Sequence, residues 1–467
     1  MKENTRIYTV FVSSGYGGAG GFPESFISNE EIINKLKKEC KGIDFIARDM
    51  LKEKLNVGSV LNELENLSEE PDGVLIFGTY KREHYSLALT GLPTIVVYNL
   101  FEFMHLPYEL YYQKGKVLTT CIDRINTTSP SVSEAMFKDL IEKIKLIQAL
   151  KKLKESKIIS ITPHKYMCIV DYKNLPPGYN EELINSLKSS LGVELIRVKP
   201  EEFYESVKMI DIKEAEKIAK MWISEAKGIE DTTEEEVIKS AKMYLGFKML
   251  KEKYNASAIT SHMRYLTDSG RVEDMTWPSL GNTEFQKYGI QGLCQDYPHL
   301  AATHLLGYYL TGKPSMLGDI MIDPFNNVSI VLHCGAPINP NGNDKVPYTI
   351  ISHAESPVRG TMKPGSGASS MVELPIGEPV TIWKIDPIKK RIILHTGISV
   401  DGHKLYKNFD NIMCRTKLVV KTEAKKVQKH FYMDEYGLHR SAIYSDIREK
   451  IENIGNLLGF EVIEEDK

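Results

Sequence analysis

The feature that most constrains the fold is an alternation of short β-branched runs with amphipathic helical segments over residues 6–157. Short apolar runs separated by helices are typical of a parallel sheet whose two faces are covered. The sequence therefore predicts an N-terminal α/β domain over residues 1–158, closed by a long helix at 133–157. The predicted strands are 6–12, 42–47, 73–78 and 94–99, and the helices between them include 29–39 and 61–67.

The same alternation resumes in the next part of the chain and predicts a second α/β domain over residues 159–315. Its strands are IISITP and LGVELIRV, and its longest helix is expected over 231–255. Thr232 and Glu235 have the spacing of a capping box at the start of that helix. Both predicted α/β domains are Rossmann-like.

The sequence pattern changes at Met316, after which predicted strands are connected by glycine- and proline-containing turns and not by helices. Such a density of strands indicates a mostly antiparallel, barrel-like domain over 316–467, which ends in a helix and a short strand. The predicted strands lie within 316–323, 328–334, 346–353, 369–386, 390–400 and 412–420.

Composition and charge exclude several classes of protein. Lys+Arg 59 against Asp+Glu 62 leaves a net charge of −3, with no basic surplus to neutralise a nucleic acid. The start MKENTRIYTVFVSS lacks the long apolar core of a signal peptide, and no later stretch approaches a membrane span, so we expect a cytoplasmic protein. The six cysteines include no CxxC pair, which argues against a disulfide framework or a structural zinc site.

A glycine motif follows the first predicted strand. Gly15, Gly17 and Gly20 satisfy G-x-G-x-x-G, which a dinucleotide-binding fold uses before a helix. Phe22 and Pro23 follow instead, so the helix whose N-terminus would hold a pyrophosphate does not start where it must. A loop at a sheet edge or at a subunit contact is the better interpretation.

The segment GLCQDYPHLAATHLLGYYLTGKPSMLGDI frames a candidate site. Pro298 suits the first turn of a helix and Gly312 ends it, so Gln295 and Asp296 lie at the helix start. Asp319 lies at the end of the next predicted strand. Starts of helices and ends of strands are where α/β sheets bind ligands. The alternative is that Asp296 caps the helix and Asp319 opens a turn.

Histidines near this segment have several interpretations. His299 and His304, at i and i+5 on one helix, do not share a face and make a poor metal pair. His333 ends a predicted strand and either contacts a ligand or caps a turn. His439, taken alone, reads as a surface or capping histidine before the last helix.

One further loop has the composition of a pocket border. HAESPVRGTMKPGSGASS is rich in glycine and serine and holds His353, Glu355 and Arg359. A solvated loop explains it equally well.

Taken in order, these pieces resemble the superfamily of L-fucose and L-arabinose isomerases, which interconvert aldoses and ketoses, and particularly its shorter fucose-isomerase-like members. The resemblance covers the chain from about Trp277 to the C-terminus. Ser445 stands where that family usually has glycine. The matching pieces are LTG at 310–312 with Asp319 seven residues past the glycine, HCG at 333–335, GEPVTI from Gly377, and the closing His439, Tyr444 and Asp446.

The resemblance implies a divalent cation, usually manganese, that grips two oxygens of an open-chain sugar. The family's Glu, Asp and His ligands fall on Gln295, Asp319 and His439. A proton then moves between C1 and C2 through an enediol, and the acidic ligands also serve as bases. A metal Lewis acid suits this chemistry because it stabilises the developing oxyanion, and carboxylates with an imidazole suit such a cation.

Gln295 departs from the pattern, because an amide oxygen binds a cation weakly and neither neutralises charge nor accepts a proton. Asp296 is adjacent, but neighbouring side chains point in different directions, so a simple replacement is not assured. Asp296 and Glu355 are the candidate bases beside Asp319, and Asp323 is another possible carboxylate donor. Substrate contacts are expected from Gln295, His333 and Arg359.

Three functions follow from this set. The first is aldose–ketose isomerisation of a free monosaccharide with a rearranged metal site. The second is carbohydrate binding or regulation without catalysis, and the third is another carbon-acid reaction, such as epimerisation or aldol cleavage. The resemblance also implies a homo-oligomer, a trimer or hexamer, in which the first domain reaches a neighbour's pocket through Tyr98, Asn99 and Phe101 or the loop near Gly17.

Overall fold

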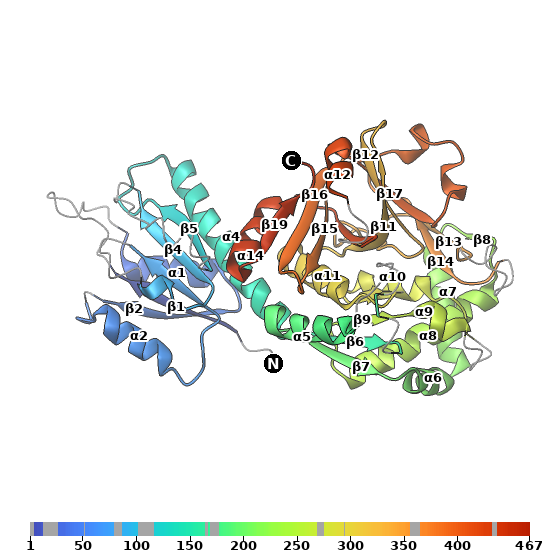
Figure 1. Cartoon of the computed structure of the whole chain (residues 1–467), viewed down its shortest axis with the longest axis horizontal. Coiled ribbons are helices and arrows are strands. Elements are labelled where there is room, and N and C mark those ends of the chain that lie inside the picture. The colour runs from blue at the N-terminus through green and yellow to red at the C-terminus, as the bar shows by residue number, and fades with distance from the viewer. Residues whose placement is uncertain are drawn as a thin grey trace. The chain divides into compact units, whose positions relative to one another are not determined.

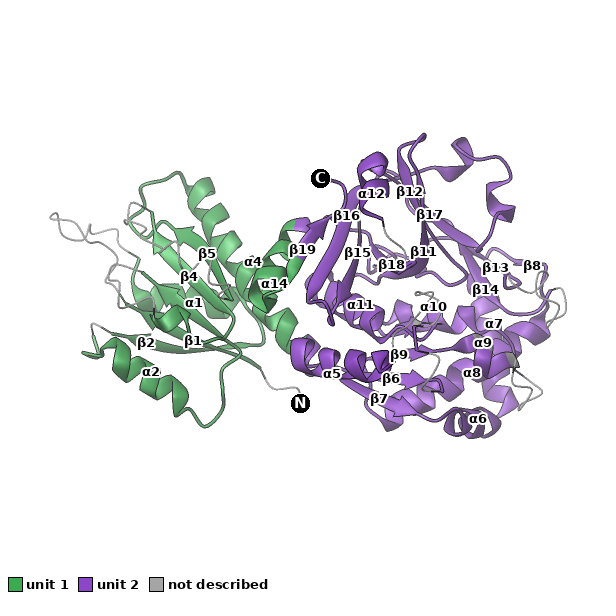
Figure 2. Ribbon diagram, in the orientation of Figure 1, with its two compact units in different colours: residues 1–152, 449–461 green, residues 153–448, 462–467 purple. Residues whose placement is uncertain are grey.

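The computed structural model describes residues 4–12, 27–50, 52–78, 86–100, 116–163, 167–168, 177–268, 275–293, 295–354, 365–431 and 437–467. The chain forms two compact units (Figure 2). Unit 1 comprises residues 1–152 and 449–461, and unit 2 comprises 153–448 and 462–467. The segments predicted as second and third domains lie largely in unit 2, whereas a helix from the C-terminal segment belongs to unit 1. Gly15, Gly17, Gly20 and Phe101 lie outside the described residues.

Unit 1 is built on a five-stranded sheet, sheet A, in the order β2-β1-β3-β4-β5 with every pair parallel. Ser28 caps the first helix in a capping box with Glu31. Lys450 and Glu142 form an ion pair of 2.8 Å between the last helix and the long helix of the unit. The strands are β1 (Thr5–Phe11), β2 (Ile43–Asp49), β3 (Gly73–Phe77), β4 (Thr94–Asn99) and β5 (Val117–Ile122), and the helices are α1 (Asn29–Glu39), α2 (Val57–Glu65), α4 (Pro130–Lys154) and α14 (Arg448–Leu458).

The first part of unit 2 is a four-stranded parallel sheet, sheet B, in the order β10-β9-β6-β7. Its longest helix is capped by Thr233, which accepts from the backbone N–H of Glu236, so the predicted cap at Thr232 was wrong by one residue. The strands are β6 (Lys157–Ile161), β7 (Glu194–Val198), β9 (Ala258–Ser261) and β10 (Gln291–Leu293), and the helices are α5 (Tyr179–Leu191), α6 (Pro200–Lys208), α7 (Ile212–Glu225), α8 (Glu234–Lys253), α9 (Met263–Asp268) and α10 (Ser279–Lys287).

The C-terminal part of unit 2 is a seven-stranded sheet, sheet D, in the order β15-β18-β11-β12-β17-β16-β19. An additional pairing of β15 with β16 closes six of these strands into a ring, and each pair within the ring is antiparallel. The strands are β11 (Met316–Asp323), β12 (Val328–His333), β15 (Pro379–Asp386), β16 (Arg391–Val400), β17 (Thr416–Lys421), β18 (His439–Ile443) and β19 (Glu461–Glu464).

Two parallel α/β sheets followed by a ring-like, mostly antiparallel sheet confirm the predicted fold class. Two strands expected in the barrel form a separate three-stranded sheet instead, sheet C, in the order β14-β13-β8. Among the described residues, no helix is both long and apolar enough to cross a bilayer. The strands of sheet C are β8 (Ile229–Glu230), β13 (Tyr348–Ile351) and β14 (Ser369–Val372).

Helix α11 (Pro298–Thr311) is the element that joins the two halves of unit 2 (Figure 1). It begins at Pro298 and ends at Gly312, whose φ of 72° is left-handed, as predicted. It contacts β6, β9 and β10 of sheet B and β15 and β18 of the ring. The turn that precedes α11 is therefore held between both sheets.

Strand β18 was not predicted, because its residues HRSAI lack an apolar alternation although every one is buried. Its charged residue is balanced inside the protein: Arg440 lies 3.5 Å from Glu465, and neither side chain is exposed. Glu465 also lies 2.9 Å from Nδ1 of His395, whose Nε2 contacts the Ser329 hydroxyl at 3.1 Å. This network ties the C-terminal segment to three strands of the ring.

We predict that Glu465→Gln destabilises unit 2 by about 3 kcal/mol or more at neutral pH, because it removes the buried carboxylate that lies 3.5 Å from the buried guanidinium of Arg440. Urea unfolding followed by tryptophan fluorescence measures this, since Trp222, Trp277 and Trp383 all lie in unit 2. The exposed Glu461 provides the control, and Glu461→Gln should stay within about 0.5 kcal/mol of the unmodified protein.

The same substitution has a defined pH dependence. Burial opposes ionisation of Glu465, but the charge of Arg440 and the hydrogen bond with His395 outweigh it and lower its pKa. Because the pKa of Glu465 is lower in the folded than in the unfolded chain, its ionisation stabilises the fold at pH values above the unfolded pKa of about 4.5. This stabilisation is lost as the pH falls through the pKa of the folded state. The difference between Glu465→Gln and the unmodified protein should therefore shrink below about pH 4.5, and a constant difference would contradict the assignment.

Candidate functional site

The pairing of β11 with β18 places Asp319 directly opposite His439. Nε2 of His439 lies 2.8 Å from a carboxylate oxygen of Asp319. The imidazole is fully buried, whereas the side chain of Asp319 is 23% exposed. Asp319 lies in the middle of its strand, not at the end as expected, and the pair presents a partly accessible carboxylate beside a buried ring.

Gln295 is connected to this pair through Tyr297. The Tyr297 hydroxyl donates to Oε1 of Gln295 at 2.5 Å, and its ring centroid lies 4.5 Å from that of His439. The structure thus links Gln295, Asp319 and His439 in one chain of contacts, although they come from widely separated parts of the sequence. Sequence reasoning did not identify Tyr297. Its position before Pro298 was a usable signal, because such residues favour extended backbone and so direct side chains two apart to the same side.

Thr260, at the C-terminal end of β9, fixes the turn that carries Gln295 and Tyr297. Its hydroxyl donates to the backbone carbonyl of Gln295 at 2.7 Å and accepts from the backbone N–H of Tyr297 at 2.8 Å. Thr260 is fully buried, so both bonds are shielded from water. Sheet B therefore positions the backbone that carries Gln295, whereas the side chain of Gln295 contacts Tyr297, which packs on His439 of the seven-stranded sheet D.

Asp296 takes no part in this chain of contacts. Its two carboxylate oxygens each accept from the Ser160 hydroxyl on β6, at 3.0 Å, and its side chain is buried. Burial raises the pKa of Asp296 to about 6, against the lowering effects of Arg197 and the hydrogen bond from Ser160. It does not cap α11, whose N-cap is Tyr297. The carboxylate proposed as a base thus lies on sheet B, away from the Gln295 side chain.

His333, at the end of β12, lies close enough to Asp319 and His439 for their charges to act on it. Burial lowers the pKa of His333. The charges of Cys334 and Asp319 act to raise this pKa, whereas the charges of His439 and His353 lower it further. The backbone N–H of Gly335 donates to Nδ1 at 3.2 Å, so in the neutral ring the proton sits on Nε2. His333 is therefore a neutral ring that carries its proton on Nε2.

Two more residues border this region. The ring of His353 stacks on Trp277, with centroids 4.1 Å apart and planes at 18°. His353 also hydrogen-bonds Cys334, the residue after His333. Glu355 and Arg359 lie outside the described residues, so their placement is not part of this geometry.

The remaining candidates make separate contacts. Nδ1 of His299 lies 3.7 Å from the Cys168 thiol, and Nδ1 of His304 lies 3.2 Å from Oε1 of Gln291. Burial, with a contribution from His333, lowers the pKa of His304 to about 3, so this histidine is neutral. Asp323 accepts hydrogen bonds in the turn after β11.

The residues present fit a divalent cation in part. Two ligands with bonds of about 2.1 Å to one cation lie roughly 3 Å apart, which matches the 2.8 Å between Asp319 and His439. The third donor would be the amide oxygen of Gln295. Within the described part of the chain, no three or more His, Cys, Asp or Glu side chains are grouped so that they could hold a metal ion. Any cation here would bind one carboxylate, one imidazole and one neutral oxygen.

The comparisons assign no family. A scan of the chain against models of known protein families finds no match. A search of curated proteins finds none with significant similarity.

We predict that Thr260→Val destabilises unit 2 by about 2–4 kcal/mol, because the valine leaves the carbonyl of Gln295 and the N–H of Tyr297 with one hydrogen bond fewer each. Thr260→Ser retains the hydroxyl and should cost about 1 kcal/mol. Urea unfolding measures both. Equal losses for the two variants would show that packing of the methyl group, not the hydroxyl, matters at this position.

Proposed function

We propose that this protein isomerises an open-chain monosaccharide between its aldose and ketose forms at the Asp319–His439 pair. The supporting observation is the carboxylate 2.8 Å from a buried imidazole, with Gln295 joined to the same imidazole through Tyr297. The family resemblance points to the same residues. A cytoplasmic location and a homo-oligomer of three or six subunits are parts of the same proposal.

The reaction needs a base for a carbon-bound proton and a carrier for a hydroxyl proton. Asp319 accepts the proton from C2 of the aldose and returns it to C1. The imidazole of His439 carries the proton of the C2 hydroxyl to the C1 oxygen. These two transfers convert the aldose into the ketose through an enediol without loss or gain of atoms.

The neighbouring residues orient the sugar. Tyr297 holds the Gln295 oxygen, which leaves the amide N–H groups to donate to a sugar hydroxyl. Neutral His333 contributes an Nε2–H donor near the developing oxyanion. Asp296 is held by Ser160 within sheet B, so we assign the base role to Asp319.

Asp319, His439 and the amide oxygen of Gln295 are the residues that would hold a divalent cation such as manganese. With a cation bound, His439 would act as its ligand and not as the carrier of the hydroxyl proton, and the cation would polarise the sugar carbonyl as a Lewis acid. The neutral amide predicts weaker binding than a second carboxylate would give.

A second candidate function is carbohydrate binding without catalysis. The observation in its favour is the same amide: Gln295 cannot accept a proton, and the grouping of described side chains provides only one carboxylate beside His439. Such a protein would bind a sugar but exchange no carbon-bound proton. Epimerisation or aldol cleavage would also require carbanion stabilisation and would yield a product other than a ketose.

We expect the unmodified protein, supplied with Mn²⁺, to exchange the C2 proton of at least one aldose for deuterium from solvent, followed by NMR. Asp319→Asn should slow this exchange by about a hundredfold or more, because an amide cannot accept the proton. The exposed Asp344 supplies the control, and Asp344→Asn should exchange at the unmodified rate. Absence of exchange over a broad panel of sugars, with and without Mn²⁺, would exclude the isomerase.

Gln295→Glu separates the two candidate functions. If glutamine is a working part of an isomerase, the substitution removes the amide donors and should lower the exchange rate about tenfold or more. If the protein binds sugars without catalysis, the glutamate can instead create exchange where there was none. NMR of the same sugars measures the rate, and calorimetric titration with Mn²⁺ should show tighter cation binding in the variant.

A further inference from the structure

Phe325 is the most exposed large apolar side chain in the described part of the chain, at 95% of its maximum accessible surface. It lies in the turn between β11 and β12 in unit 2. A single exposed apolar residue is common on protein surfaces and has no meaning alone. Two features of its surroundings distinguish Phe325: the rigidity of its turn and the charge beside it.

The turn is held by Asp323, which accepts from the backbone N–H groups of Phe325 at 2.9 Å and Asn326 at 3.0 Å. It also accepts from the Asn326 amide and from the Tyr406 hydroxyl, each at 2.7 Å. These bonds lower the pKa of Asp323 to about 2, so the carboxylate that organises the turn stays ionised at neutral pH. The backbone at Phe325 is thus held in a defined turn, which reduces the entropy lost on binding.

The surface beside this turn is basic. Helix α12 (Ala424–His430) begins next to it, because the backbone N–H of Ala424 donates to Oδ1 of Asn327 and that of Thr422 to the Asn327 carbonyl. Residues 421–430 contain four lysines and one glutamate, and all five are exposed. None of these lysines forms an ion pair with another described residue. The lysines are Lys421, Lys425, Lys426 and Lys429.

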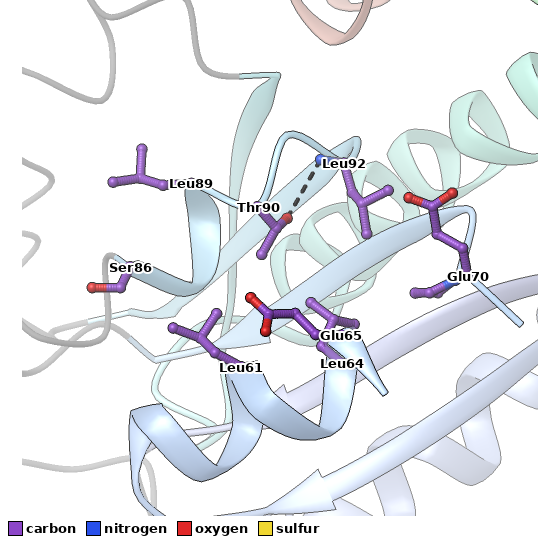
Figure 3. Close-up of a pocket in the computed structure, with 9 residues that line it drawn as sticks. Leu61, Leu64, Glu65, Glu70, Ser86, Leu89, Thr90 and Leu92 are labelled. Atoms are coloured by element: carbon purple, nitrogen blue, oxygen red, sulfur yellow. Dashed lines mark hydrogen bonds between the residues drawn. The ribbon is translucent and has the colours of Figure 1, made fainter. Parts of the chain in front are cut away.

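Unit 1 carries a hollow with an apolar lining and acidic residues, in contrast to the basic surface beside Phe325, and its volume is about 530 Å³. Figure 3 shows leucines of α2 on one side and residues 86–92 on the other. Its apolar lining includes Leu61, Leu64, Leu89 and Leu92. Leu89 is 54% exposed, so part of this apolar surface faces solvent.

The rim of the hollow is acidic. Residues 61–72 contain five carboxylates and no basic residue. Three of them are neutralised: Glu63 by Arg48, Glu69 by Arg6 and Asp72 by Lys151. Glu65 and Glu70 line the hollow, are exposed, and form no ion pair with a described residue.

We propose that the Phe325 turn of one copy of this chain inserts into the hollow of unit 1 of a second copy. An aromatic side chain on a rigid turn meets an apolar hollow, and the lysines beside the turn meet Glu65 and Glu70 at its rim. Burying an exposed phenylalanine and pairing opposite charges both favour this contact. The contact joins two different surfaces, so it is heterologous and builds a ring when its rotation closes.

The test is sedimentation velocity of the full-length chain over a wide range of concentration. The unmodified protein should self-associate, and Phe325→Ser should weaken association about tenfold or more. Ser86→Trp, which fills the hollow from an exposed position, should do the same. Met209, 72% exposed in the same unit as Phe325, gives the control, and Met209→Ser should associate like the unmodified chain.

Mixing distinguishes insertion into a second copy from any other effect of these substitutions. The Phe325→Ser chain keeps an intact hollow and the Ser86→Trp chain keeps an intact Phe325, so their mixture should form a 1:1 complex that neither forms alone. A mass distribution for Phe325→Ser equal to that of the unmodified protein would overturn the proposal. So would a monomeric unmodified protein, or association that survives Ser86→Trp.

Charge reversal tests the electrostatic part independently of packing. Glu65→Lys with Glu70→Lys should abolish self-association, as should Lys425→Glu with Lys429→Glu. A mixture of the two double variants restores both complementary contacts and should associate again. Failure of the mixture to associate would show that these charges do not face each other.

Discussion

The structure of the candidate site depends on the insertion of β18 between β11 and β15. If β18 did not pair with both strands, the ring of sheet D would be open between them, and His439, the first residue of β18, would not face Asp319. With β18 in place, the antiparallel register places His439 opposite Asp319. On its other side, β11 is approached closely by β12: a Cβ atom added at Gly318 would lie 2.5 Å from Cγ1 of Val331 and 2.9 Å from the backbone of Leu332. Ring closure and site geometry are therefore the same constraint.

Much of the fold could be predicted from the sequence because many of its helices and strands follow ordinary physical rules. The parallel sheets are formed by apolar runs separated by helices, and α11 begins at a proline and ends at a left-handed glycine. Strand β18 does not follow these rules. Arg440 is charged and fully buried, and its partner Glu465 comes from beyond the last strand. A local pattern of polarity cannot reveal a strand whose polar groups are balanced by residues distant in the chain.

The candidate site was accessible from the sequence only in part, for a related reason. Gln295, Asp319 and His439 were selected by resemblance, and their mutual distances depend on strand register, which the chain order alone does not specify. Tyr297 was missed because its contacts with Gln295 and His439 are visible only in the folded chain. Asp296 was selected for its charge and its adjacency to Gln295, but extended backbone directs neighbouring side chains to opposite sides. Its carboxylate is accordingly bonded to Ser160 on sheet B.

The amide at position 295 changes the electrostatics of the site in a definite direction. With His439 neutral, Asp319 alone gives the donor set a charge of −1, whereas a glutamate at 295 would give −2. Two carboxylates around one buried imidazole repel each other and raise each other's pKa unless a cation lies between them. The amide removes this repulsion, so the polypeptide can adopt the site geometry with one ionised group. A divalent cation bound to such a set retains more positive charge, and would bind less tightly but polarise a sugar carbonyl more strongly. In the proposed isomerase, glutamine at this position would therefore lower the affinity for the cation and increase its strength as a Lewis acid, a combination that suits a site in which the cation and the sugar bind together.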